Sequence, residues 1–290
     1  MRVCVFGLWH LGAVTSACLA EAGFDTIGLD ADQARVDSLA KGEPPLFEPG
    51  LEAMVRSGLE SGHLSFTTDI AVVHDVDVVW VAFDTPVDDD DHADTGFVTS
   101  QIRSIFPHLQ DGAVVLVSSQ MPVGTLAEIE RQFMAEAAGR RVAFACSPEN
   151  LQLGKAIQVF CHPERVIIGL RDEMGKDVLA ALFASFSDNI IWVGVEAAEL
   201  SKHALNIFLA ASITFINEIA MVCEKFGANV RDVERALRSE PRVGQNAYIR
   251  PGGAFAGGTL ARDVNFLTEI AHDNGLPLDM ISNILVSNRF

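Results

Sequence analysis

Hydrophobic residues gather in short runs from Met1 to about Gly194. The runs are rich in Val and Ile and do not alternate strictly with polar residues, which is typical of strands buried on both faces of a sheet. They are RVCVF, DTIGLD, HLSFT, DVVWVAF, AVVLVSS, RVAFACS, RVIIGL and NIIWVG. Helical patterns such as TLAEIERQFMAEAAG and DEMGKDVLAALFASF lie between them. Strand–helix–strand repetition predicts an α/β fold, a doubly wound parallel sheet with helices on both faces.

The pattern changes after Gly194. The segment EAAELSKHALNIFLAASITFINEIAMVCEKFGA predicts one long helix that is apolar over much of its surface. Two or three shorter helices and a glycine-rich loop, RPGGAFAGGTLARD, follow it. We therefore expect a doubly wound domain over residues 1–194 and an all-helical domain over residues 195–290. A helix this long and this apolar predicts a homodimer formed through it.

Composition narrows the class of partner. The chain has 290 residues, 49% of them hydrophobic and 21% charged, as in globular proteins. Its net charge of −18 argues against nucleic acid or an anionic membrane as the main partner, because both require a basic surface. We expect no membrane span, since His203 and Asn206 interrupt the most apolar stretch. The five cysteines show no paired spacing and no targeting segment precedes the first strand, so a cytoplasmic location is expected.

The stretch VCVFGLWHLGAVTSACLAEAGFDTIGLDAD resembles the opening of a dinucleotide-binding, Rossmann-like unit. Gly7 supplies the glycine of the tight bend, and Gly12 the one that lets the helix pack on the strand. Trp9 stands where a second glycine usually lets the backbone approach the pyrophosphate. His10 and Leu11 open a helix whose free amides still suit a phosphate. The turn alone therefore leaves two readings open, a cofactor site or its fold without a cofactor.

Asp30 ends the second predicted strand. It is placed to accept hydrogen bonds from the adenosine ribose hydroxyls of a dinucleotide. An acid at this position favours NAD over NADP, whose additional phosphate it would repel, although Arg35 lies nearby in the sequence. NAD is the cofactor that we expect.

Segments along almost the whole chain resemble, in order, those of the UDP-glucose/GDP-mannose 6-dehydrogenase family. They are GEPPLFEPGLEAMV, DTPVDDDDHAD, MPVGT, SPENLQLGKAIQVFCHPERVIIG, ELSKHALNIFLAASITFINEIA, EPRVG and GGTLARD. The resemblance implies an NAD-binding domain followed by a helical dimerisation domain. It also implies an enzyme that oxidises the CH2OH group of a nucleotide sugar to a carboxylate in two hydride transfers to NAD.

The resemblance further implies site residues. Lys202 and Asn206, one helical turn apart, match the family's catalytic Lys and Asn, and Glu149 and Asp263 match its catalytic acids. The remaining implied residues are Thr85 and Ser119 for the cofactor and Leu151, Arg242, Gly257 and Gly258 for the substrate. Plainer readings stay open: a surface lysine at 202, a helix-capping acid at 149 and an ordinary exposed arginine at 242. We expect no metal site, and interpret the acidic run Asp88–Asp91 as solvated surface.

The chain departs from the family at functional positions. The family's second oxidation uses a cysteine thiolate, and Leu260 stands in its place, which cannot form a covalent bond to an aldehyde. Gln120 and Arg262 replace a Thr and a Lys of the family. Cys146 and Cys161 are alternative nucleophiles, although buried cysteines more often serve packing.

Three functions remain open at this point. The first, which we carry forward, is an NAD-dependent nucleotide-sugar dehydrogenase with an altered thioester step. The second is a two-electron alcohol dehydrogenase of the 3-hydroxyacid dehydrogenase type, favoured by Leu260. The third is a non-catalytic binding or scaffold homologue, favoured by Trp9. Members of the family usually continue into a third domain, so the chain is either naturally short or a fragment.

Overall fold

The computed structural model describes residues 1–85, 94–137, 139–149, 151–256 and 259–289. These residues form two compact units, one extending to Leu200 and the other beginning at Ser201. The expected domain boundary after residue 194 stays a prediction. Gly257, Gly258 and the run Asp88–Asp91 lie outside the described residues.

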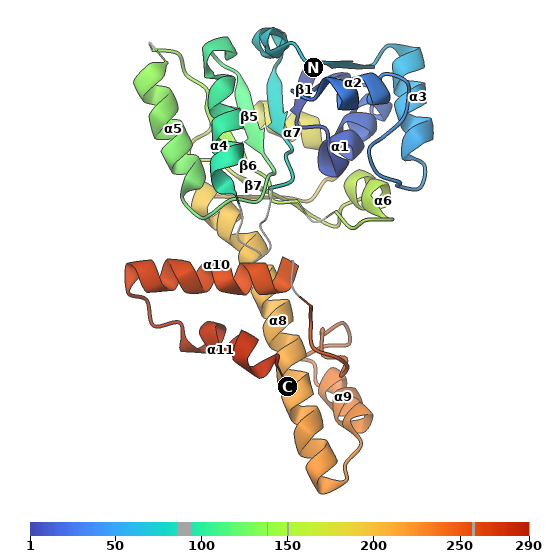
Figure 1. Cartoon of the computed structure of the whole chain (residues 1–290), viewed down its shortest axis with the longest axis vertical. Helices are drawn as coiled ribbons and strands as arrows, with labels where there is room; N and C mark the ends of the chain where they lie inside the picture. Colours follow the sequence, from blue (N-terminus) through green and yellow to red (C-terminus); the bar gives the residue numbers. More distant parts are fainter. Residues whose placement is uncertain (86–93, 138, 150, 257–258, 290) are drawn as a thin grey trace. The chain divides into compact units, whose positions relative to one another are not determined.

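The first unit is built on one sheet, and all eight predicted strands are present (Figure 1). They are β1 (Arg2–Phe6), β2 (Asp25–Leu29), β3 (Leu64–Thr67), β4 (Val78–Val81), β5 (Val114–Val117), β6 (Ala143–Cys146), β7 (Val166–Gly169) and β8 (Ile190–Val193). Their order is β3-β2-β1-β4-β5-β6-β7-β8. The predicted doubly wound α/β class is confirmed.

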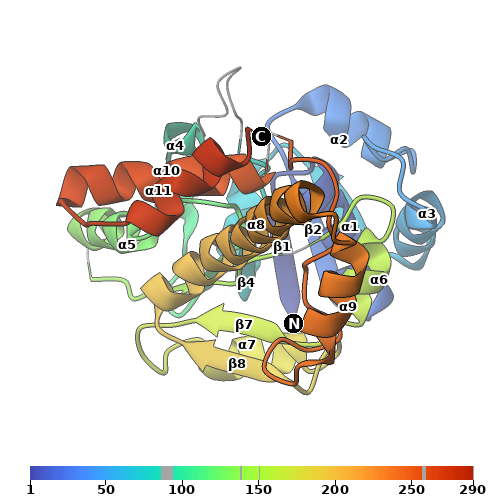
Figure 2. The ribbon, with the colours of Figure 1, turned by 90° about the horizontal axis from the view of Figure 1, so that it is seen from below.

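The last two strands run against the other six. Strand β7 pairs antiparallel with β6 and parallel with β8, which lies beside it (Figure 2). The hydrophobic pattern did not indicate this reversal, because a strand buried on both faces has the same pattern in either direction. The carboxyl ends of β1, β2, β4, β5 and β6 still meet at one edge, where doubly wound sheets bind their ligands.

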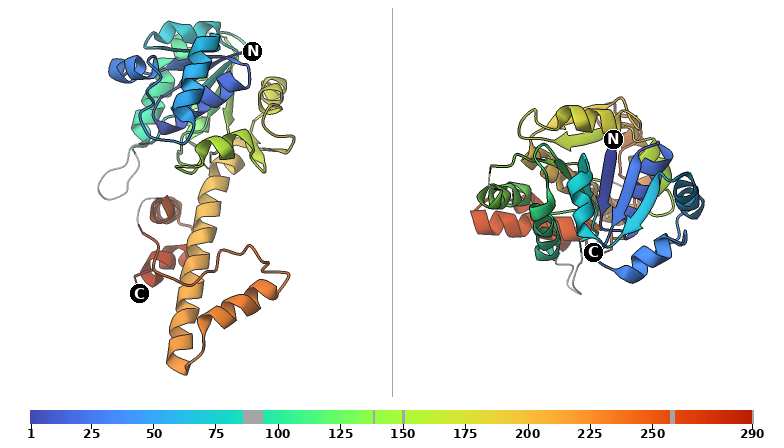
Figure 3. Two further views of the ribbon diagram at one scale, coloured as in Figure 1. Left: turned by 90° about the vertical axis from the view of Figure 1, so that its right-hand side faces the viewer. Right: turned by 90° about the horizontal axis from the view of Figure 1, so that it is seen from above.

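Helices cover both faces of the sheet (Figure 3). One face packs against α1 (His10–Glu21), α2 (Gln33–Leu39), α3 (Leu51–Ser61), α6 (Ala156–Cys161) and α7 (Lys176–Phe183). The other packs against α4 (Thr95–Ser104), α5 (Thr125–Glu136) and two 3-10 turns, η1 (Ile70–Asp75) and η2 (Phe106–His108). Alternate residues of each central strand therefore enter different cores, which explains their unbroken hydrophobicity.

The turn between β1 and α1 needs two of its glycines. Gly7 has a φ of +96°, in the left-handed region that favours glycine. A Cβ on Gly12 would lie 1.7 Å from the Gly7 carbonyl oxygen, so no side chain fits there. Trp9, at the position of the missing second glycine, has a φ of −73° and a ψ of −150°, which any L-residue adopts. The backbone at this position therefore tolerates a large residue.

The second unit is helical, as predicted. The long helix α8 (Val195–Phe226) supplies most of its length, and α9 (Val230–Ser239), α10 (Thr259–Asn274) and α11 (Asp279–Ser287) follow. Helix α9 turns back along the end of α8 (Figures 1 and 3). A small core joins Ile207 and Ala210 of α8 to Val264 of α10 and Ile284 of α11.

Helix α8 is long and apolar enough to cross a membrane by length and composition alone. Its most apolar window has a mean hydropathy of 1.7, and 28% of that window is buried within the chain. The expectation that His203 and Asn206 leave no apolar stretch of sufficient length is wrong, because both lie within α8 and its mean hydropathy is still high enough. Both side chains are buried within the second unit.

Candidate cofactor and substrate site

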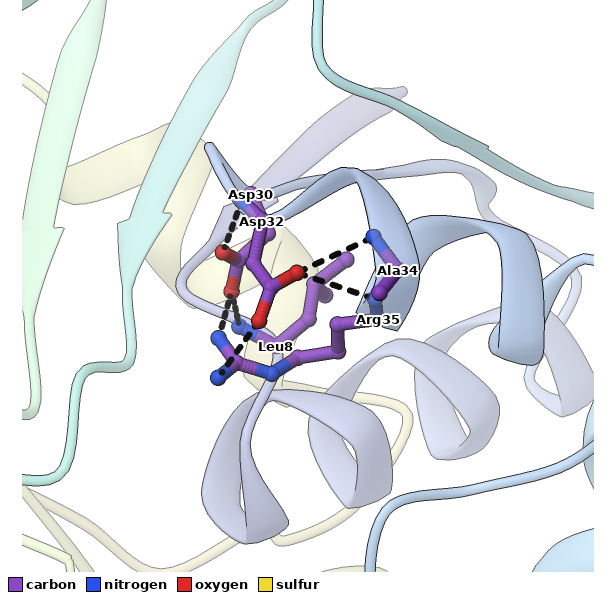
Figure 4. A network of polar contacts seen from close by, with 5 residues as sticks. All are labelled: Leu8, Asp30, Asp32, Ala34 and Arg35. Carbon is purple, nitrogen blue, oxygen red and sulfur yellow. Dashed lines mark hydrogen bonds and ion pairs between the residues drawn. The ribbon is translucent and has the colours of Figure 1, made fainter.

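Asp30 lies at the carboxyl end of β2, and its side chain is buried (Figure 4). Its Oδ2 accepts hydrogen bonds from the Leu8 amide and from Arg35 Nη1, both at 2.7 Å. Its Oδ1 accepts a hydrogen bond from the Asp32 amide at 3.0 Å. Three donors thus hold the carboxylate beside the glycine turn, in the position expected for the acid of a dinucleotide site.

Arg35 joins the start of α2 to the glycine turn. Asp32 caps α2 through the amides of Ala34 and Arg35, and its Oδ2 lies 3.4 Å from Arg35 Nη2 (Figure 4). The guanidinium carbon of Arg35 is 5.3 Å from the centroid of the Trp9 ring, within the range of a cation–π contact. Trp9 is 41% exposed, so its ring is not packed into the interior of the turn.

His10, at the first turn of α1, is tied to another predicted segment. Its Nε2 lies 3.2 Å from Oε2 of Glu48, a buried residue of the loop before α3. Glu48 also accepts hydrogen bonds from the amides of Gly154 at 2.7 Å and Ala156 at 2.9 Å. One carboxylate therefore connects α1, the GEPPLFEPG loop and the start of α6.

Thr85 and Ser119 follow β4 and β5 at the same sheet edge. The Thr85 hydroxyl donates to the carbonyl oxygen of Gln120 at 2.6 Å. The Ser119 hydroxyl is buried and has no hydrogen-bond partner within the part of the chain that the structure describes. Buried hydroxyls are rarely left without a partner, so this orphan oxygen fits a bound ligand such as a dinucleotide.

Glu149 and Leu151 follow β6. A Glu149 carboxylate oxygen accepts a hydrogen bond from the Leu151 amide, and Glu149 makes further polar contact within the structure. Leu151 packs against the core on the α1 face of the sheet. This local bond stabilises the turn after β6. The role of Glu149 toward water stays a prediction.

The two alternative cysteines lie in different surroundings. Burial raises the pKa of the Cys146 thiol, and the Glu199 carboxylate raises it further, so this thiol resists forming a thiolate. A hydrogen bond from Cys18 lowers the pKa of Cys161 to about 7. Cys18 is buried in α1, while Cys161 is partly exposed at the end of α6. Of the pair, Cys161 is the thiol that ionises first.

The second unit brings two predicted catalytic residues together. Asn206 of α8 donates through Nδ2 to Oδ2 of Asp263 on α10, and both residues are buried. Nδ1 of His203 lies 3.1 Å from the other carboxylate oxygen of Asp263. The His203 ring stacks on Phe266 with 4.7 Å between ring centroids. Asp263 thus fixes the Asn206 amide. His203 is a further polar partner of this carboxylate, which would be costly to bury alone.

Other residues of this unit that the sequence singled out differ in how far they are buried. Lys202 is half-buried one helical turn before Asn206, and it makes polar contact within the structure. Arg262 is also half-buried and in polar contact. Arg242 is exposed and pairs with Glu240 at 2.9 Å, as an ordinary surface arginine does. Leu260 packs against the small core formed by α8, α10 and α11.

The sequence did not single out Glu48 and His203 of these arrangements, nor Asp84, an acid that follows β4 beside the glycine turn. Glu48 carried a signal, an acid in a loop that matched the family, but its partners are about a hundred residues away. The only signal for His203 in the sequence is its position next to Lys202. Asp84 carried the clearest signal, because it follows β4 at the edge where β1 also ends.

Sequence models of known families match both parts of the chain. Residues 1–187 match the UDP-glucose/GDP-mannose dehydrogenase family, NAD binding domain, and residues 196–289 match the central domain of the same family. UDP-glucose 6-dehydrogenase of Rhizobium meliloti (strain 1021) is 35% identical over 295 residues, which cover 99% of this chain and 67% of that protein. The chain spans 62% to 67% of the length of this and three further UDP-glucose 6-dehydrogenases.

Solved structures agree with these matches. A UDP-glucose dehydrogenase from Pyrobaculum islandicum superposes with a TM-score of 0.89 at 29% identity, covering 99% of this chain and 68% of that one. A 3-hydroxyisobutyrate dehydrogenase from Mycobacterium tuberculosis gives a TM-score of 0.70 at 16% identity, covering 98% of this chain and 90% of that one. The second likeness shows a common fold and nothing more.

Proposed function

The chain belongs to the UDP-glucose/GDP-mannose dehydrogenase family, and from this membership we propose that it is an NAD-dependent oxidoreductase acting on the CH–OH group of a nucleotide sugar. The observation that carries the proposal is the buried pair formed by Asn206, on the helix α8 that also holds Lys202, and Asp263 of α10. Burying a carboxylate between an amide and a histidine is a costly arrangement, and a site that must orient a substrate oxygen gives a reason for it.

The cofactor half of the proposal rests on the first unit. Asp30 and the amides at the start of α1 suit the ribose and pyrophosphate of NAD, and the orphan Ser119 hydroxyl offers a further contact. A bound NAD would supply the hydride acceptor. The proposed cofactor site also keeps the other residues of this sheet edge, which are Gly7, His10, Leu11, Gly12 and Thr85.

The substrate half rests on the second unit and on the loop after β6. In the proposal, Lys202 takes the proton of the alcohol while Asn206 holds its oxygen, so that a primary alcohol and NAD give an aldehyde, NADH and a proton. Asp263 keeps the Asn206 amide oriented, and Glu149 orders water at the site. The proposed contacts of the nucleotide sugar are Leu151, Arg242, Gly257 and Gly258.

We further propose that the reaction stops after one hydride transfer. The family position of the thioester-forming cysteine is Leu260, whose side chain packs into an apolar core and offers no nucleophile. Of the two alternative nucleophiles, the Cys146 thiol is held protonated by burial, and Cys161 lies at the end of α6, where it is hydrogen-bonded to the buried Cys18 of α1. The lack of a nucleophile at position 260 favours oxidation of the alcohol only as far as the carbonyl, by the same enzyme.

A homodimer through α8 and a cytoplasmic location complete the proposal. Phe208, Phe215 and Val222 are exposed by 66%, 48% and 54% at positions seven residues apart on α8. This spacing places them along one side of the helix, as at a helix–helix interface. An apolar stripe that faces a second copy explains the hydropathy of α8 without a membrane, and the net charge of −18 disfavours nucleic acid and anionic lipid.

Turnover by the full-length protein tests the proposal. Incubation with NAD and either UDP-glucose or GDP-mannose is expected to form NADH. Failure of both sugars would turn the search to other nucleotide sugars, whereas a folded protein that does not bind NAD would support the non-catalytic reading favoured by Trp9.

A further inference from the structure

Asp84 lies directly against the glycine turn. It follows β4, the neighbour of β1, through Ala82 and Phe83. The Ala82 amide donates to the Phe6 carbonyl at 2.8 Å, and a Cβ on Gly7 would lie 2.7 Å from the Phe83 ring. The backbone that carries Asp84 is therefore fixed beside the start of α1 by contacts that do not involve the Asp84 side chain.

The backbone amide of Leu11 lies near the Asp84 carboxylate and acts to lower its pKa. That amide belongs to the first turn of α1, a twelve-residue helix whose free N–H groups and positive end attract anions. In a dinucleotide-binding unit the pyrophosphate binds at this end. The chain thus places a carboxylate of its own where the anion of the cofactor is expected.

The charges around Asp84 come from two helices. Arg35 of α2 and, in its protonated form, His10 of α1 are the positive groups near it. Each has an acid of its own, since His10 contacts Glu48 at 3.2 Å and Arg35 contacts Asp30 at 2.7 Å. These cations are therefore partly neutralised before any ligand arrives, and a pyrophosphate beside an ionised Asp84 would meet little net positive charge.

The surroundings also make Asp84 easier to protonate. Burial raises the pKa of Asp84 above its ordinary value, although His10, the Leu11 amide and Arg35 oppose the rise. The side chain keeps an exposed surface, so protons reach it from solvent. An adjacent pyrophosphate would raise the same pKa further, because a second anion disfavours the carboxylate form.

We propose that ionised Asp84 competes with the pyrophosphate of NAD for the start of α1, so that binding of NAD is accompanied by uptake of a proton at Asp84. This inference rests on the proposed NAD-dependent function and names the residue that limits cofactor affinity. Affinity rises as the pH falls, because protonation removes the competing charge, and it levels off once Asp84 is neutral in the free protein.

Calorimetric titration of the full-length protein tests the inference. NAD and ADP-ribose, which carry the pyrophosphate, and adenosine, which does not, are titrated into the wild type and the Asp84→Asn variant. The titrations use buffers of different ionisation enthalpy and a metal chelator. Asp84→Asn is expected to bind NAD and ADP-ribose about tenfold more tightly near neutral pH, which corresponds to about 1.4 kcal/mol, and to lose proton uptake. Adenosine affinity should be unchanged.

Two further variants make the result specific. Glu60→Gln removes an exposed acid at the end of α3, near the opposite edge of the sheet, and should behave as wild type. Asp84→Gly should reproduce the gain if Asp84→Asn fails to fold. Equal NAD affinity in wild type and Asp84→Asn, or proton uptake that persists and so belongs to His10, would overturn the inference. Weaker binding by Asp84→Asn would overturn it too, by making Asp84 a ligand of the cofactor.

The same experiment separates this inference from the proposed function. If wild type and variant both bind NAD with the same affinity and the same proton balance, only the role of Asp84 fails. If neither folded protein binds NAD or ADP-ribose at any pH tested, the proposed cofactor fails and the inference fails with it.

Discussion

Asn206 and Asp263 are separated by 57 positions in the sequence, yet their side chains bond to each other in the interior of the second unit. The sequence resemblance named both residues but could not show that they touch, since that depends on how α10 packs on α8. It could not name His203 either, because a histidine on an apolar helix is an unremarkable core residue until its partner is known. Residue identity was predictable here, whereas the hydrogen-bonded arrangement was not.

Leu260 could be identified from the sequence as a functional departure, whereas Asp84 could not. Leu260 was recognised as a substitution that removes chemistry, and its packing among apolar side chains agrees with that reading. Asp84 was not predicted to matter, although it opens the segment DTPVDDDDHAD, which resembles the family. A charge matters at this position only because β4 lies beside β1, which is a fact of strand order.

Lys202 is the residue whose substitution should reduce catalysis most directly. Lys202→Met keeps the aliphatic length of the side chain and removes the ammonium group. We expect kcat with a nucleotide sugar to fall about 10²- to 10⁴-fold, the usual contribution of a general acid–base group, with NAD affinity unchanged. Steady-state kinetics and calorimetry measure the two quantities. Lys225→Met, in the last turn of α8, is the matched control. An unchanged kcat would return Lys202 to the plainer reading of a structural lysine.

Elements were predicted better than their connections. The strands and the long helix follow from hydrophobic patterning, and the structure confirms them. The reversal at β7 and the anchoring of α6 by Glu48 depend on contacts across the fold. A pattern of local hydrophobicity contains no information on strand direction or on a partner a hundred residues away.

Glu48 should stabilise the start of α6 in a pH-dependent way. Burial alone would raise the pKa of Glu48, but the Gly154 and Ala156 amides and His10 together lower it below its ordinary value. The stabilisation is therefore complete above the unfolded pKa of about 4.3 and is lost as the pH falls through the lower, folded value. Glu48→Gln should reduce the free energy of unfolding by about 1–3 kcal/mol at neutral pH.

Urea unfolding at a series of pH values measures this effect. The difference between wild type and Glu48→Gln should shrink in acid, and Glu60→Gln should match wild type throughout. A difference that is absent at neutral pH would show that the three hydrogen bonds of Glu48 contribute nothing net to stability.

The exposed stripe of α8 makes a prediction about assembly. Phe215→Glu places a charge in the middle of the stripe formed by Phe208, Phe215 and Val222, and it should convert a dimer into a monomer because an unpaired charge is costly to bury at an interface. Light scattering after gel filtration measures the mass of the full-length protein. Glu224→Gln, an exposed position on another side of the helix, should stay dimeric. A wild type that is monomeric at all concentrations would refute the dimer.

The two units of the molecule contain different groups of the residues that the proposed reaction uses. The first contains the residues suited to the dinucleotide, and the second contains the Asn206–Asp263 pair and Lys202. The chain spans about two thirds of its curated relatives, so the whole protein is the proper object of an activity measurement. The net charge of −18 and the family membership are the grounds on which we propose a small-molecule substrate.

The most direct test of the account is the number of NADH molecules formed per nucleotide sugar consumed by the full-length protein. We expect one, with an aldehyde that a carbonyl reagent traps, because no thiolate is available at position 260 to continue the oxidation. Two NADH and a carboxylate product would contradict the single-step proposal and require another nucleophile. No NADH from any nucleotide sugar tested, in a protein that is folded and binds NAD, would contradict the dehydrogenase itself.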